Sequence, residues 1–476
     1  MYKKIILIYI VLVAGTLFLS SSVYGSDENS DKIFELKRLS LKPAAEPIPA
    51  LSYRLLPRFS EQKNGNAALF YYAATGFYPD EEGIDISEKI SDWRNIPFEQ
   101  LDRMEVERTL SYFSACFHQI ELATRRNYCQ WEMPIEEGFA MQMPNLAKFR
   151  RIIYALELKI QLEIANGNIE QVMKLLQQGM YMGRSIAEGP TLIQGLVGIA
   201  IDALMLDEIE SFIQRPDAPN FYWALTSLPD PFVSLQRAIQ TEREVIFFEF
   251  PELRDLENKV LTPEQATKFV TEFLIKLNSL GSPFDEMVPF NNLMPAGFVM
   301  IHYYDAKKHL ESKGFSNERI EQMPAAQAVM IYQKQQYMEI VDNIYKWFEL
   351  PYSQVQSRFN EAEKLASKQQ NNNGFKTNVF FMIMPAVSRI AFMEARLERD
   401  IAMLRTIEAI RMFAANHSGE IPESLADITI VPIPVDPVTG KNFVYKKVDK
   451  LNARLEAPKI PENDDKLPAY ELSFKK

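Results

Sequence analysis

The sequence predicts a mainly α protein made of helical hairpins, in part tetratricopeptide-like, with a small C-terminal α+β module. Glycine is scarce, with 18 in 476 residues, whereas methionine and large apolar residues are plentiful, and this composition favours helices over turn-rich β structure. Apolar residues recur every three or four positions over long stretches. A turn followed by alternating residues occurs near the C-terminus, and the length suits two or three domains.

The N-terminus has the parts of a secretory signal peptide. Lys3 and Lys4 precede an apolar run at 5–19 that ends in short side chains, so we expect residues 1–25 to be a signal peptide. The alternative is an uncleaved anchor, because residues 5–25 carry no charge after the lysines and are just long enough to span a bilayer. Both interpretations place the body of the chain outside the cytoplasm, in the periplasm or at the cell surface.

The segment after the signal is expected to be extended and not to form a domain. Residues 26–60 are polar at first and then rich in proline, which fits poorly inside helices. From 61 to 366 the pattern is helical, and we expect a helical domain there. A polar, low-complexity stretch at 367–378 is expected to be a linker.

Residues 145–189 contain the clearest helical hairpin. Ile153, Leu156 and Ile160 are three or four positions apart, so they share one helix face. Gly167 follows, where a helix end favours a left-handed residue, and the apolar pattern then resumes. A loop this short makes two helices pack antiparallel, and the spacing is similar to a tetratricopeptide hairpin, although no clear repeat of that length exists.

Two glycines interrupt the very apolar stretch that follows. Gly195 and Gly198 lie inside a helical pattern, where a glycine costs about 1 kcal/mol relative to alanine. Close packing against another helix is the expected compensation. Further along, Thr262, Pro263 and Gln265 form a helix start signal.

Residues 379–476 are predicted to form a long helix and a small α+β module. The helix is expected from apolar residues spaced by three and four, namely Ile390, Met393, Leu397, Ile401, Leu404, Ile407 and Ile410. Gly419 is the expected terminator of this helix.

The motif VDPVTGK contains a Gly-Lys pair, which invites comparison with a phosphate-binding loop. That loop needs a glycine five positions before Gly440 and Ser or Thr after the lysine, but Val435 and Asn442 stand there. We expect a hairpin instead. Asp436 and Pro437 suit the opening of a β-turn, and Gly440 can adopt a positive φ.

Charge and histidine content restrict the classes of site. The net charge of −11 is offset by no local cluster of Lys or Arg, which argues against nucleic-acid binding. His302, Asp305 and His309 would share a helix face and form a candidate metal site. The simpler interpretation is a mixed polar face, because Lys307 and Lys308 lie beside them. We therefore predict no metal and no cofactor.

A second candidate is an acidic cluster around the apolar run VIFF, consisting of Glu242, Glu244, Glu249 and Glu252. A carboxylate pair there could act as acid and base, but a solvated helix face is the simpler interpretation. The aromatic run at 221–223 could line a pocket or pack in the core, and packing is favoured. No HExxH, GxSxG or Gly-rich dinucleotide loop occurs, so no catalytic residue is predicted.

Cys116 and Cys129 are the two cysteines. Export makes a disulfide between them a reasonable expectation, and it would add about 3 kcal/mol for a loop this short. Two buried free thiols are the alternative, and the sequence leaves both open. No CxxC or Cys/His zinc spacing is present.

The stretch from 404 to 447, LRTIEAIRMFAANHSGEIPESLADITIVPIPVDPVTGKNFVYKK, resembles the soluble part of type II secretion pseudopilins. Those proteins run a long helix into a Pro-x-Ser-Leu segment, a Pro-x-Asp-Pro turn and small strands. The resemblance covers about a tenth of the chain. It departs at the processing site, where Val379 stands in place of the family's glutamate. Calcium binding in some pseudopilins makes Asp436 and Asp449 further candidates.

The whole chain resembles a family of exported, mostly helical bacterial proteins that has no assigned activity. The segments RRNYCQWEMPIEEGF, AEGPTLIQGLVGIAI and APNFYWALTSLPDP carry this resemblance, which implies architecture and no substrate. We expect an exported, non-enzymatic scaffold that binds protein partners in the cell envelope. An enzyme or small-molecule binder with a site between helices, and an accessory of a secretion or pilus-like machine, are the alternatives.

Overall fold

The computed structural model describes residues 34–79, 86–141, 145–279, 293–371, 378–380, 387–460 and 466–475. Helices dominate it, and a small sheet lies near the C-terminus, so the predicted mainly α class with a small α+β module is confirmed. The predicted signal peptide at 1–25 and most of the predicted linker, 372–377, lie outside the described residues.

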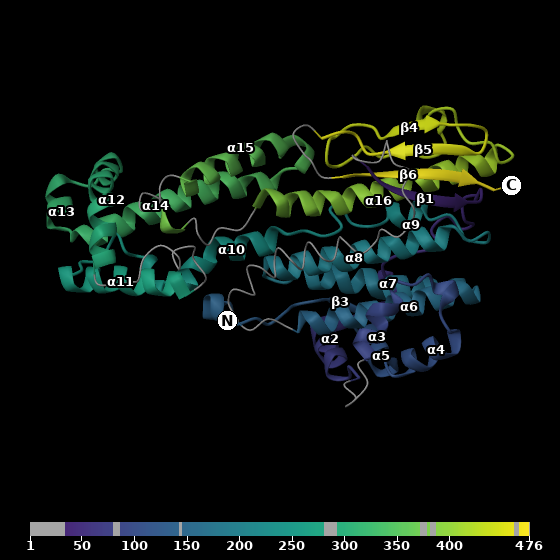
Figure 1. The fold of residues 1–476 in the computed structure, drawn as a ribbon, viewed down its shortest axis with the longest axis horizontal. Coiled ribbons are helices and arrows are strands. Elements are labelled where there is room, and N and C mark those ends of the chain that lie inside the picture. The colour runs from purple at the N-terminus through teal and green to yellow at the C-terminus, as the bar shows by residue number, and fades with distance from the viewer. Residues whose placement is uncertain are drawn as a thin grey trace.

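One four-stranded sheet joins both ends of the described chain (Figure 1). Its strand order is β1-β6-β5-β4. The strands are β1 (Phe34–Leu41), β4 (Val444–Lys447), β5 (Asn452–Glu456) and β6 (Leu467–Phe474). β1 runs parallel to β6, with Phe34 opposite Leu467 and Leu41 opposite Phe474, and the other two pairs are antiparallel. The N-terminal lead-in therefore contributes an edge strand to the C-terminal module.

Three long helices form the centre of the molecule: α6 (Leu146–Asn166), α7 (Ile169–Ala187) and α8 (Leu192–Ile213). Gly167 ends α6 with φ of 76° and donates its N–H to the carbonyl groups of Glu163 and Ile164. The left-handed conformation reverses the chain within two residues, and α7 packs back against α6. This is the hairpin that the apolar periodicity predicts.

Glycines allow α7 and α8 to approach closely. A Cβ atom on Gly198 would lie 2.4 Å from the carbonyl oxygen of Gly183 and 2.5 Å from Cβ of Ala187. A Cβ atom on Gly195 would lie 2.4 Å from Cδ2 of Leu235. At Gly198 the added atom would meet backbone atoms, so no side chain fits there, whereas at Gly195 it would meet only the end of the Leu235 side chain. Close packing at both positions is the compensation expected for two glycines inside a helix.

Shorter elements pack on one side of this centre. They are β2 (Lys63–Asn66), α2 (Ala67–Gly76), α3 (Ile86–Trp93), α4 (Arg103–Ser111), α5 (Ser114–Thr124) and β3 (Arg126–Tyr128). α3 and α4 contact α6, and α5 contacts α7. We call α2 to α5 together with β3 the α2–α5 layer, which lies at the bottom of Figure 1.

Of the remaining helices, α9 lies beside the sheet and the others extend away from it (Figure 1). They are α9 (Tyr222–Thr226), α10 (Gln236–Glu249), α11 (Pro263–Ser279), α12 (Leu293–Ser312), α13 (Asn317–Gln322), α14 (Ala325–Tyr345) and α15 (Tyr352–Asn371). α11 begins at the predicted signal, where the N–H of Gln265 donates to Oγ1 of Thr262 at 3.2 Å. Figure 1 shows α11 to α14 at the end of the molecule opposite the sheet.

The long C-terminal helix is enclosed by the rest of the fold. α16 (Val387–Asn416) contacts α8, α9 and α15, and it lies beside the sheet (Figure 1). Buried apolar side chains form one connected core from Leu39 to Phe474. The chain on both sides of the predicted linker therefore shares one core.

The hairpin expected within the VDPVTGK region is wrong in its pairing. β4 follows the turn, but its partner is β5, and the residues before the turn form no strand in the described structure. Pro432 and Pro434 explain the difference, because each lacks the backbone N–H that a paired strand donates.

Candidate functional site

The turn at Asp436 is fastened to α16 by a buried ion pair. Arg399 donates from Nε and Nη2 to the two carboxylate oxygens of Asp436 at 2.8 and 3.0 Å, and the side chains are 1% and 0% exposed. The same carboxylate accepts the N–H groups of Val438 and Thr439 at 3.1 and 3.2 Å. Gly440 has φ of 68° and donates its N–H to the carbonyl of Asp436. These residues therefore serve a structural turn.

A second buried pair on α16 fastens the chain near the end of β1. Arg411 donates to both carboxylate oxygens of Glu408 at 2.8 and 3.0 Å, and both side chains are fully buried. Its other N–H groups reach the carbonyls of Lys42 and Ala218 at 3.0 and 3.1 Å. Glu408 also accepts the N–H of Phe221 at 2.7 Å. Every partner belongs to the chain itself.

β1 is held to α8 and β6 by a further cluster. Nζ of Lys37 lies 2.6 Å from Oδ1 of Asp207 and 2.9 Å from both carboxylate oxygens of Glu210. The hydroxyl of Tyr470 donates to Oε1 of Glu210 at 2.6 Å. Burial raises the pKa of Glu210 to about 7, although the Lys37 ammonium opposes that shift.

Two carboxyls meet between α6 and α8. Glu157 pairs with Nε of Arg94 at 3.0 Å, and Glu208 accepts from Nε2 of Gln161 at 2.8 Å. Burial raises the pKa of Glu157 to about 7, and burial together with the Glu157 charge holds the pKa of Glu208 well above its usual value. One cation faces two carboxyls, so the pair retains a proton near neutral pH.

A third group of carboxyls surrounds the loop between α9 and α10. Glu398 of α16 accepts the N–H of Phe232 at 2.6 Å, and Glu394 accepts the N–H of Leu235 at 3.4 Å. Arg184 of α7 donates to the carbonyl of Phe232 at 3.2 Å. Asp202 of α8 is fully buried nearby, and neither of its carboxylate oxygens has a hydrogen-bond partner within the described residues.

The candidate metal ligands on α12 do not converge. Nδ1 of His302 lies 3.2 Å from Nε2 of Gln333, and Nε2 of His309 lies 3.0 Å from Oε1 of Gln335. Asp305 is exposed. Among the residues that the structure describes, no group of three or more His, Cys, Asp or Glu side chains could hold a metal ion.

The second calcium candidate, Asp449, is exposed, and its carboxylate forms hydrogen bonds within its own loop. It accepts the N–H groups of Leu451 and Asn452 at 2.8 and 2.9 Å. Asp436 is buried in the pair with Arg399, so the two carboxylates predicted by the resemblance act separately.

The acidic cluster around VIFF separates into unrelated contacts. Glu249 pairs with Nζ of Lys276 at 3.0 Å, and Glu252 is exposed. Glu244 lies 3.7 Å from Arg254. Burial raises the pKa of Glu242 to about 7.

The remaining sequence candidates are packing residues. In the aromatic run, Phe221 and Tyr222 are buried in the core. Cys116 and Cys129 are both free and buried, and Sγ of Cys116 donates to the carbonyl of Ala74 at 3.3 Å. The disulfide left open by the sequence is therefore absent between these two residues. Burial raises the pKa of Cys116 to about 11 and that of Cys129 to about 12, which keeps both thiols protonated and weakly nucleophilic.

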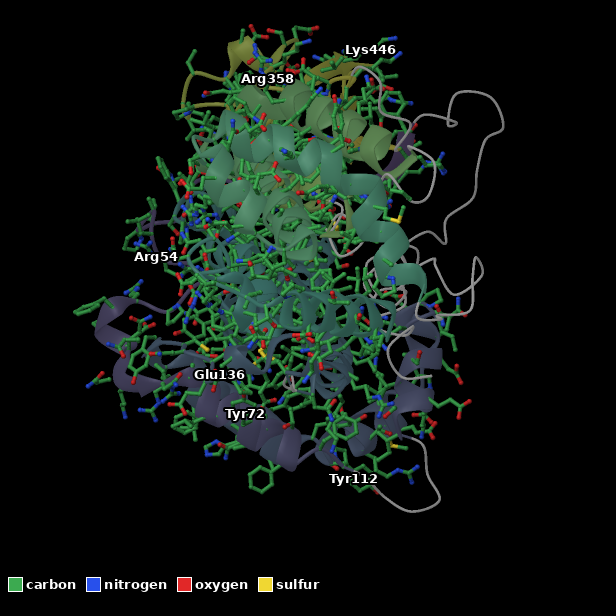
Figure 2. The ribbon with its side chains drawn as sticks, turned by 90° about the vertical axis from the view of Figure 1, so that its left-hand side faces the viewer. Arg54, Tyr72, Tyr112, Glu136, Arg358 and Lys446 are labelled. Atoms are coloured by element: carbon green, nitrogen blue, oxygen red, sulfur yellow. The ribbon has the colours of Figure 1, made fainter. Side chains whose placement is uncertain are left out.

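Exposed apolar side chains are concentrated on the α2–α5 layer. Seven of the twenty exposed large apolar side chains of the described residues lie between residues 69 and 128. They are Leu69, Tyr72, Phe77, Ile96, Met104, Tyr112 and Tyr128. Tyr72 and Tyr112 both lie along the lower margin of the molecule in Figure 2. This surface is the candidate binding site.

The sequence predicted only a helical domain over 61–366 and did not separate these exposed side chains from those of the core. The positions of these residues around the helix axis could have shown this difference. In α4, Val106 and Leu110 are buried four positions apart, whereas Met104 is 78% exposed on another face of the same helix.

Comparisons with protein-family models, with curated proteins and with solved structures gave no match. Within the described ranges, no helix combines the length and apolarity needed to cross a membrane.

Proposed function

We propose that the chain is an exported scaffold that binds protein partners in the cell envelope and acts by binding, not by catalysis. The observation that carries this proposal is the concentration of exposed apolar side chains on the α2–α5 layer. Leu69 is 67% exposed and Met104 is 78% exposed. Burying such surface against a partner gains about 25 cal/mol per Å² of apolar area, so a protein surface is the natural counterpart.

The charge of the same layer defines the chemistry of the partner. Exposed carboxylates on α3 and α4 and the turn between them are those of Glu88, Asp92, Glu99, Asp102 and Glu107. Exposed cations there are fewer, with Arg103 and Arg108. We therefore expect a partner whose apolar contact patch is bordered by Lys and Arg, since complementary charge speeds encounter and favours one docking orientation.

The buried ionisable groups support binding over catalysis. The carboxyls with raised pKa values accept hydrogen bonds from Tyr470, Gln161 and the backbone of the α9–α10 loop. These contacts join helices and strands to one another. A scaffold needs such internal contacts for its stability, and it binds its partner through its exposed surface.

The alternative of a pilus-like accessory gains less support. Assembly through a long helix requires that helix to offer an apolar face to neighbouring subunits. α16 packs its apolar residues against α8, α9 and α15, and Leu397, Leu404 and Ile407 are at most 2% exposed.

The proposal is tested by replacing two exposed residues of the layer in the full chain, Leu69→Glu and Met104→Glu. The matched control is Ile48→Glu with Val260→Glu, at positions that are 97% and 98% exposed elsewhere. We expect chemical crosslinking in the cell envelope, read by quantitative mass spectrometry, to lose its partner with the first pair and keep it with the control. Thermal unfolding checks that both variants fold. The proposal is overturned if the variant with Leu69→Glu and Met104→Glu keeps every crosslinked protein of the wild-type chain. It is also overturned if the wild-type chain crosslinks to no protein.

A further inference from the structure

β4 is the outermost strand of the four-stranded sheet, and one of its edges is open. In the order β1-β6-β5-β4 it pairs with β5 alone among the described strands. β4 lies near the upper margin of Figure 1, and Lys446 lies at the top of Figure 2. The α2–α5 layer lies at the bottom of Figure 1, so the open edge is a separate surface on the opposite side of the molecule.

The register identifies the backbone groups on the open edge. The N–H of Val448 donates to the carbonyl of Asn452 at 2.8 Å, in the same register as the paired residues of β4 and β5. Because the direction of hydrogen bonding alternates along an antiparallel strand, even-numbered residues of β4 face β5, and Tyr445 and Lys447 face outward. Within the described part of the chain, the outward N–H and carbonyl groups of these two residues have no hydrogen-bond partner. Such unpaired groups are a template for another strand.

The side chains on the exposed face of β4 form a small apolar surface with a cation at its centre. Val444 and Val448 are 50% and 64% exposed. Lys446 is exposed between them, on the same face of the strand. A strand added at this edge would therefore place every second side chain beside an apolar, a basic and again an apolar side chain.

The other face of β4 is anchored through side chains. The hydroxyl of Tyr445 donates to the carbonyl of Pro422 at 2.9 Å, and Nζ of Lys447 donates to the carbonyl of Ile421 at 3.1 Å. These contacts hold the strand in place and leave its outward backbone groups available.

Charge around β4 selects an acidic occupant. Lys441, Lys446 and Lys450 are exposed, and no carboxylate of the described residues forms an ion pair with them. The exposed carboxylates nearby are already bound, that of Glu423 in an ion pair with a lysine of β4 and that of Asp449 in hydrogen bonds of its own loop. A carboxylate on an incoming strand would supply the missing counter-charge.

The same lysine disfavours a second copy of this chain as the occupant. In a symmetric antiparallel pair of two β4 strands, the two copies of Lys446 would lie opposite or diagonal to each other. Like charges in such positions destabilise a sheet. The occupant is therefore a different protein.

We propose that the open edge of β4 binds an extended segment of a partner protein, which adds to the sheet as a fifth, antiparallel strand. The segment carries a carboxylate opposite Lys446 and apolar side chains two positions to either side, opposite Val444 and Val448. These three pairs lie between the hydrogen-bonded pairs, where side chains are closest, so they set selectivity while the main chain supplies affinity. This inference does not depend on the proposed function of the α2–α5 layer.

Fluorescence anisotropy of a labelled peptide, Thr-Val-Thr-Glu-Thr-Val-Thr with both ends blocked, tests the side-chain pairing on the full chain. A second peptide has Lys in place of Glu. We expect the wild-type chain to bind the Glu peptide about fivefold more tightly, the range of a cross-strand ion pair. Lys446→Glu, at an exposed position, should reverse this preference.

Two substitutions at one position test the main-chain pairing. Lys447→Pro removes an N–H that faces away from β5, and Lys447→Ala removes the same side chain but keeps that N–H. We expect Lys447→Pro to bind the Glu peptide about tenfold more weakly than Lys447→Ala, because a main-chain hydrogen bond is lost and the proline ring blocks the edge. Circular dichroism and thermal unfolding check that both variants fold.

Four results would overturn the proposal. The first is that the wild-type chain binds neither peptide, and the second is that it binds both equally. The third is equal binding by Lys447→Pro and Lys447→Ala. The fourth is self-association of the wild-type chain in analytical ultracentrifugation that Lys447→Pro abolishes and Lys447→Ala keeps, because a second copy would then occupy the edge.

Discussion

At the scale of single residues, we expect the buried Arg399 side chain to contribute strongly to the free energy of unfolding. It is bound to Asp436 through two hydrogen bonds with no access to water, so Arg399→Met leaves a buried carboxylate without its counter-charge. We expect a loss of about 3–5 kcal/mol in the free energy of unfolding, measured by urea denaturation. The control is Arg358→Met, whose pair with Glu361 is more than half exposed on both sides and whose loss should cost less than about 1 kcal/mol. Equal losses in the two variants would contradict a structural role for the buried pair.

At the scale of elements, the glycine crossing of α7 and α8 sets how closely the central helices pack. Gly198→Ala places a methyl group 2.4 Å from the carbonyl of Gly183, so the helices must separate. We expect a lower thermal unfolding midpoint, with a cost of about 1–3 kcal/mol from overpacking. Gly297→Ala in α12 is the matched control, because no atom lies within 4 Å of its added Cβ and alanine favours helix. A Gly198→Ala protein as stable as the control variant would refute the close crossing.

The helices, strands and buried carboxyls differ in how far the sequence alone could predict them. Local periodicity and the turn at Gly167 were enough for α6 and α7. β1 was missed as a strand because its partner, β6, lies more than four hundred residues away, and parallel pairing leaves no local signal. Asp202 was missed because a carboxyl on an apolar helix looks the same whether it is solvated or buried. Asp436 was predicted as a turn residue, but its pairing with Arg399 depends on how α16 passes the turn.

At the scale of the whole molecule, the N-terminal strand closes the fold. β1 supplies the edge beside β6, Lys37 binds α8, and Arg411 of α16 binds the carbonyl of Lys42. The C-terminal module depends on these contacts and on a core that it shares with α8 and α9. Residues 379–476 produced alone should therefore give the collapsed amide spectrum of an unfolded chain, although its own helix and three strands are complete.

The matched comparison is the full chain without residues 34–47. It keeps the helical core, so we expect it to stay folded by circular dichroism while hydrogen exchange shows loss of protection confined to β6, β5 and the start of the α9 segment. The reason is that β6 then presents an open edge, Glu210 loses the Lys37 ammonium, and Arg411 loses the carbonyl of Lys42. A well-dispersed spectrum from residues 379–476 alone, or unchanged protection of β6 in the shortened chain, would show that the module folds without the N-terminal strand.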